Sequence, residues 1–128
     1  MKSSIFFIAF SLLSSFSYAQ VFVGDVDINA ADSVNVIEVF IDRRMSRKSV
    51  DVYVDFGQND NSNALTIVGN SDNLMITVPG TKKKMVFKST AAVINFLQNN
   101  NWEHYNNLSV DTGNFAGFYY YFRKKTTK

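Results

Sequence analysis

The chain has 128 residues and contains no cysteine, which excludes disulfides and a lipid-modified cysteine. A single histidine is present, so the common zinc-ligand sets and a Cys-His nucleophile are absent as well. Thirteen basic residues against eleven acidic ones leave a charge near zero, which argues against nucleic acid as a partner.

Residues 1–19 have the order of a secretory signal peptide. Lys2 precedes an apolar run from Ile5 to Leu13, and small residues stand three before and immediately before Gln20. A membrane anchor is the weaker alternative, because serines interrupt the run and it is shorter than the roughly 20 residues that cross a bilayer. We predict cleavage after Ala19, a single domain over residues 20–128, no membrane span after cleavage, and a periplasmic or secreted location.

Strand patterns dominate the first half of the mature chain. Residues 20–24 suit a short strand, and the segment from Asp25 resembles an exit into a turn. Residues 34–42 are apolar on nearly both faces, which predicts a strand near the centre of a sheet or against a helix. Residues 50–56 alternate more simply, with valines on one face and a polar face made of Asp51, Tyr53 and Asp55.

Turn residues separate the next short segments. We expect a loop over residues 57–63, a short strand over 65–68 and a turn over 69–73. A strand over 74–78 then enters a hairpin at Pro79 and Gly80, where proline presets the first central position and glycine supplies the positive φ of a type II turn. The chain returns over residues 84–87.

Residues 89–101 carry the helical pattern of this sequence. Ser89 is the expected N-cap, with Thr90 as the alternative, because a side-chain hydroxyl can accept a hydrogen bond from a free amide of the first turn. Three asparagines end the helix, since asparagine tolerates the left-handed conformation that closes many helices. The predicted core anchors are Phe96, Leu97 and Trp102.

Aromatic residues fill the last predicted strand, which follows an extended segment over 105–111 and a turn over 112–114. Residues 116–123 place Phe118, Tyr120 and Phe122 on one face and Tyr119, Tyr121 and Arg123 on the other. Short turns join most strands, so we predict an α+β fold in which one main helix packs on one face of a small, mostly antiparallel sheet.

The ending of the chain resembles small uncharacterised bacterial proteins of the DUF4177-like type. In those, a helix ends in a Gly-Trp-Glu motif and leads into strands that close with an aromatic and a basic residue. Residues 101–103 (NWE) stand at that motif with asparagine in place of glycine, and residues 117–125 match the aromatic strand. Residues 24–29 (GDVDIN) and 53–58 (YVDFGQ) resemble stretches of short secreted proteins that share this ending. The resemblance implies a small α+β fold and no known activity.

Candidate metal and acid-base groups each have a simpler interpretation. Asp25, Asp27 and Asn29 have the spacing that begins a calcium loop, but Ala30 and Val36 occupy the positions of its glycine and its bidentate glutamate. A solvated strand end is therefore the preferred interpretation. The pair Asp51 and Asp55 is better explained as surface charge, and His104 as a packed or half-exposed residue. We predict no catalytic, cofactor-binding or metal-binding residues.

Three tyrosines are the candidate interface: Tyr53, Tyr119 and Tyr121 could present an aromatic surface to a sugar, a peptide or a partner protein. The first hypothesis is a secreted or periplasmic non-enzymatic module that binds a protein or an envelope component through this sheet face or an open edge. The alternative is a small ligand-binding protein or hydrolase with a pocket between helix and sheet. Residues 82–84 (KKK) and the basic tail are interpreted as a solvated turn and a frayed terminus.

Overall fold

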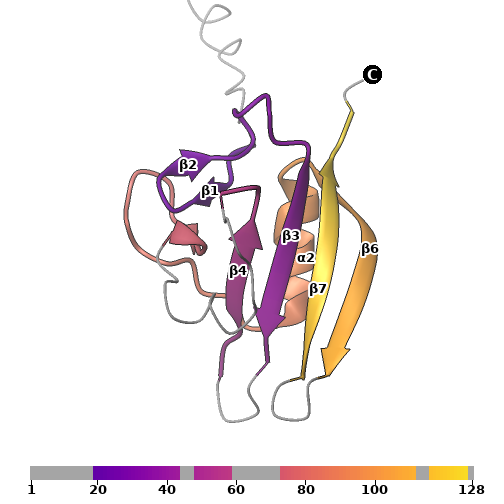
Figure 1. The fold of residues 1–128 in the computed structure, drawn as a ribbon. Coiled ribbons are helices and arrows are strands. Elements are labelled where there is room, and N and C mark those ends of the chain that lie inside the picture. The colour runs from indigo at the N-terminus through magenta and orange to yellow at the C-terminus, as the bar shows by residue number, and fades with distance from the viewer. Residues whose placement is uncertain (1–18, 44–47, 59–72, 112–115, 127–128) are drawn as a thin grey trace, which may run out of the picture.

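The computed structural model describes residues 19–43, 48–58, 73–111 and 116–126. These residues form two antiparallel sheets and one helix, which confirms the predicted α+β class (Figure 1). The elements, in chain order, are β1 (Phe22–Val23), β2 (Val26–Asp27), β3 (Val36–Asp42), β4 (Asp51–Asp55), β5 (Ile76–Thr77), α2 (Thr90–Asn99), β6 (Trp102–Asp111) and β7 (Ala116–Lys124).

The larger sheet has the strand order β4-β3-β7-β6, and each neighbouring pair is antiparallel. β3 lies between β4 and β7, as its two apolar faces predicted, because an inner strand covered on both sides has no solvated face. The expected last strand is confirmed as β7, whereas β6 begins at Trp102, three residues before the predicted extended segment. The predicted strand at residues 65–68 and the predicted turn at 112–114 lie outside the described residues, as do residues 59–63 of the predicted loop and residues 69–72 of the predicted turn over 69–73.

The smaller sheet has the order β2-β1-β5 and contains a hairpin that differs from the prediction. The segment from Asp25 was expected to leave the strand, but the chain turns at Gly24 and Asp25 and pairs again, with Val23 opposite Val26. Gly24 has a φ of 59°, the left-handed conformation that a two-residue hairpin loop requires and that glycine adopts without strain. The hairpin at Pro79 and Gly80 forms as predicted, with Gly80 at φ 75° and the Thr81 amide donating to the Val78 carbonyl at 3.0 Å.

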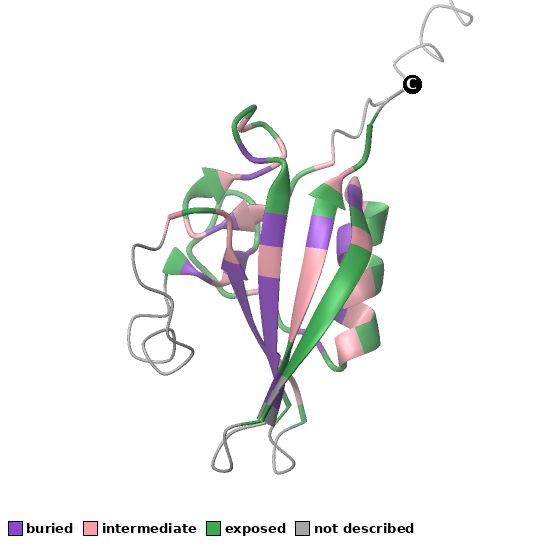
Figure 2. Ribbon diagram, turned by 45° about the vertical axis from the view of Figure 1, so that its right-hand side comes forward, coloured by how far each residue is buried: buried purple, intermediate pink, exposed green. Residues whose placement is uncertain are grey.

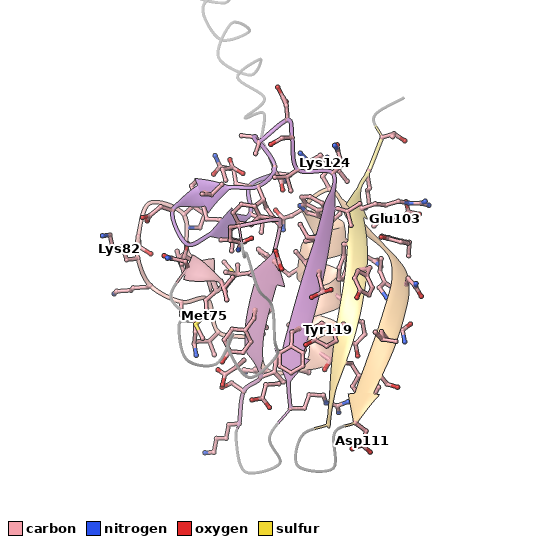
Figure 3. All side chains as sticks on the ribbon, in the orientation of Figure 1. Met75, Lys82, Glu103, Asp111, Tyr119 and Lys124 are labelled. Carbon is pink, nitrogen blue, oxygen red and sulfur yellow. The ribbon has the colours of Figure 1, made fainter. Side chains whose placement is uncertain are left out.

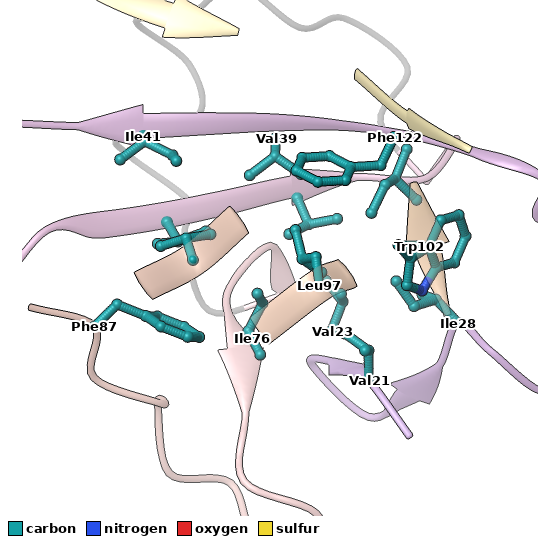
Figure 4. Close-up of a cluster of buried hydrophobic side chains, with 14 of the residues drawn as sticks. Val21, Val23, Ile28, Val39, Ile41, Ile76, Phe87, Leu97, Trp102 and Phe122 are labelled. Carbon is teal, nitrogen blue, oxygen red and sulfur yellow. The ribbon is translucent and has the colours of Figure 1, made fainter. Parts of the chain in front are cut away.

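α2 covers one face of the larger sheet, and the burial pattern shows its inner side facing the strands (Figure 2). Val93 and Leu97 are fully buried there, together with Val39 of β3 and Phe122 of β7. Side chains in and directly before the strands of the small sheet complete this core, among them Val21, Val23 and Ile76 (Figure 4). Leu97 and Trp102 are confirmed as anchors, whereas Phe96 is only half-buried and packs edge-on against Phe87, with 5.3 Å between ring centroids.

Both ends of α2 are capped as the sequence predicted. The Ala92 amide donates to the Ser89 Oγ at 3.1 Å, and Ser89 itself is extended, which is the geometry of an N-cap. At the other end, Asn101 has a φ of 73° and turns the chain directly into β6. Within the described residues, no helix combines the length and the apolar character needed to cross a bilayer.

Asn29 ties the amino-terminal segment to the end of the helix. Its side-chain amide donates to the carbonyl oxygens of Ala19, at 3.0 Å, and Asn100, at 2.9 Å. Its Oδ1 accepts a hydrogen bond of 2.6 Å from the indole N–H of Trp102. The buried tryptophan therefore has a partner for its polar atom, which burial of an indole requires.

Candidate functional site

The face of the larger sheet opposite α2 carries two of the three predicted interface tyrosines. Tyr119 pairs with Phe40 of β3, and Tyr121 pairs with Glu38, so their side chains share a face with those of their partners. Phe122, the next residue, is buried in the core beneath α2, which fixes Tyr121 on the other side. Tyr119 and Tyr121 are each half-buried.

Tyr53 lies on the same face, but it is buried rather than available as an interface residue. Only 6% of it is exposed, because it belongs to a second apolar cluster with Phe40 and Leu74. The rings of Phe40 and Tyr53 are stacked with 6.1 Å between centroids, and Tyr119 lies against Phe40 at 5.1 Å. Met75 pairs with Tyr53 through an isolated bridge and packs at the border of the cluster (Figure 3).

Two residues of β6 extend the exposed part of this face and were missed by the sequence interpretation. Tyr105 is 45% exposed, with its ring centroid 6.5 Å from that of Tyr121, and Leu108 is 53% exposed and pairs with Tyr119. The register shifts between His104 and Asn106, so Tyr105 is the extra residue of a β-bulge. We call Tyr105, Leu108, Tyr119 and Tyr121 the tyrosine patch.

Charged side chains next to the tyrosine patch pair with one another or with a tyrosine of the patch. Arg123 donates to the Glu103 carboxylate at 3.0 Å, and its guanidinium lies 5.6 Å from the centroid of the Tyr105 ring. The hydrogen bond and charge of Arg123 lower the pKa of Glu103. Burial, together with the hydrogen bond and the negative charge of Glu38, raises the pKa of Tyr121 to about 12. The hydroxyl of Tyr121 is therefore held protonated against Glu38.

The candidate calcium residues have separate structural roles. The Asp27 carboxylate accepts hydrogen bonds from the backbone amides of Asn29, at 3.0 Å, and Ala30, at 3.4 Å. This arrangement is an Asx-type turn, in which a short polar side chain satisfies the backbone two or three residues further on. Asp25 lies on the exposed hairpin turn, and Asn29 bonds Trp102 as described above.

The candidate acid-base groups lie apart and have structural contacts. Asp51 is buried and forms a 2.9 Å ion pair with Lys84, and the Asp55 carboxylate accepts from the Gly57 amide at 2.8 Å. His104 is half-buried with its ring against Tyr120 and Phe122, at 5.8 and 5.4 Å between centroids. Within the described part of the chain its buried Nε2 has no hydrogen-bond partner.

The space between α2 and the larger sheet is filled by core side chains of both elements, including Val93, Leu97 and Phe122. Two open clefts, of about 340 and 240 Å³, lie instead beside the small sheet, next to the turn of Gly24 and Asp25. No family model matches the chain, and the comparisons with curated proteins and with solved structures found no similar protein.

Proposed function

We propose that this protein is an exported, non-enzymatic binding module that recognises a protein or an envelope component through the tyrosine patch. The observation that supports this proposal is a group of exposed apolar and aromatic side chains on the sheet face that α2 leaves uncovered. Tyr105 and Leu108 each expose close to half of their surface, beside two half-buried tyrosines. Aromatic residues with one apolar and one polar end are enriched at binding interfaces.

The patch is also rigid, which favours binding. Its tyrosines stand on two long paired strands, and the contacts of Tyr121 with Glu38 and of Arg123 with Glu103 fix the side chains around them. A surface that is ordered before binding loses less conformational entropy when a partner docks. Export is supported by the sequence of residues 1–19 and by the complete burial of Val21, so that the core starts directly after the proposed cleavage site.

The test is affinity capture from the envelope fraction with the exported protein, whose first residue we expect to be Gln20. A Tyr105→Ser/Tyr121→Ser protein should lose its specific partners, since it lacks the two neighbouring rings of the patch. A partner that the wild type captures should then bind the purified variant at least about tenfold more weakly, as expected when interface anchors are truncated.

Phe118→Ser is the matched control, because Phe118 lies on the same strand but on the opposite face and is 39% exposed. It should keep every partner that the wild type captures. Capture that survives the tyrosine substitutions, with thermal stability unchanged, would contradict the proposed function.

A further inference from the structure

A second surface, formed by residues 78–88, combines positive charge with exposed apolar side chains. Within this segment, which we call the lysine turn, Val86 is 67% exposed and Val78 39% exposed. Its four lysines are all exposed: Lys82, Lys83, Lys84 and Lys88. Cationic and apolar groups are therefore interleaved on one short stretch of the surface.

The extended backbone of the lysine turn explains this arrangement. Lys84 forms an isolated β-bridge with Thr77, and Phe87 forms one with Val50. Residues 84–87 therefore run as a strand-like segment in which alternate side chains face opposite ways. Met85 and Phe87 face the core, and Val86 and Lys88 face outward. An apolar side chain is thus held outward between lysines by the burial of its neighbours.

The charge of the lysine turn is only partly compensated. Lys84 pairs with Asp51, whereas no salt bridge within the described residues engages Lys82, Lys83 or Lys88. Among the described residues, Asp25 is a second acidic residue at this surface, because it lines the cleft of about 340 Å³ together with Lys82 and Lys84. Within the described part of the chain, four lysines against these two carboxylates leave a local positive excess, although the protein as a whole is nearly neutral.

We infer that the lysine turn docks on an anionic phospholipid surface. Lysines near such a surface are attracted to its negative potential, and exposed apolar side chains between them can enter the headgroup layer. The apolar stem of a lysine can cover apolar surface while its ammonium group stays in water. Val86 and the lysines beside it therefore fit both the apolar and the anionic parts of a lipid surface. A nucleic acid would satisfy the lysines but would leave Val78 and Val86 exposed to water.

The lysine turn lies apart from the tyrosine patch: in Figure 3, Lys82 is at the left edge of the molecule, whereas Tyr119 lies over the larger sheet. A protein bound to lipid through the lysine turn would therefore leave the tyrosine patch accessible. The inference goes beyond the proposed function and does not depend on it.

Co-sedimentation of the exported protein with vesicles tests this inference. Vesicles of phosphatidylglycerol and phosphatidylethanolamine should bind the wild type, vesicles of phosphatidylcholine should not, and added salt should weaken the binding. A Lys82→Gln/Lys83→Gln protein should bind about tenfold or more weakly, since each lysine near an anionic surface contributes about 1 kcal/mol. Val86→Ser should weaken binding while leaving its salt dependence unchanged.

Arg43→Gln/Lys125→Gln is the control with the same change of charge, because both residues are exposed and lie outside the lysine turn, directly after β3 and directly after β7. It should bind as the wild type does, and so should Tyr105→Ser/Tyr121→Ser. Equal binding to phosphatidylcholine, equal loss in the control, or equal affinity for a DNA duplex at the same salt concentration would overturn the lipid assignment.

Discussion

Asn29 connects three segments of the chain through one side chain. It bonds the carbonyls of Ala19 and Asn100 and accepts the indole N–H of Trp102, 73 positions away in sequence. The predicted cleavage after Ala19 would remove the first of these bonds and leave the other two. From the sequence, Asn29 stood out only for its spacing from two aspartates. Its role could not be predicted, because the partner of a buried polar atom depends on tertiary contacts that no local pattern contains.

We expect Asn29→Ala to lower the free energy of unfolding by about 1 to 3 kcal/mol, the cost of leaving a buried donor without a partner. Urea denaturation measures this loss. In a Trp102→Phe background the same change should cost less, since the indole N–H is already gone. Equal losses in the two backgrounds would show that the hydrogen bond to Trp102 does not carry the effect.

Tyr121 predicts a specific alkaline dependence of stability. Its folded-state pKa of about 12 exceeds the ordinary value of 10.0, so the folded protein keeps this proton after the unfolded chain has released it. The stabilisation is therefore complete below pH 10 and is lost as the pH rises through 12. Tyr121→Phe, which cannot ionise, should show a shallower fall in Tm over this range. Parallel curves for the two proteins would contradict this assignment.

Among the elements, α2 is the one whose ends could be read closely from the sequence. Ser89 and the asparagines at residues 99–101 act on their own neighbours, and local interactions of this kind are visible in a linear pattern. β1, β2 and β5 have only two residues each, and their pairing depends on contacts with one another. This dependence explains why the hairpin around Gly24 was predicted as a turn leaving the sheet.

The Ser89 cap gives a prediction at this scale. Ser89→Ala removes the acceptor for the Ala92 amide, so it should lower the free energy of unfolding by about 1 kcal/mol. Ser89→Asp should retain most of the stability, because aspartate caps as well as serine does. Thermal unfolding of both proteins checks this expectation, and equal stability of Ser89→Ala and the wild type would contradict it.

At the scale of the whole molecule, alternation along the strands predicted which side chains share a face but not what covers that face. Tyr119 and Tyr121 lie opposite Phe122, as predicted. Tyr53 is on the same face as these tyrosines, yet Leu74, which precedes β5, belongs to the cluster that buries it. The exposed half of the candidate site comes instead from β6, where a bulge decides which residues face outward.

That bulge has a consequence for how copies of this protein meet one another. β6 ends the larger sheet, and an exposed terminal strand offers free backbone groups on which another chain could pair and grow into an aggregate. The extra residue at Tyr105 interrupts the regular spacing of those groups, and asparagines at positions 106 and 107 disfavour continued pairing. The same irregularity that brings Tyr105 beside Tyr121 thus makes the strand a poorer template for pairing with another copy of the chain.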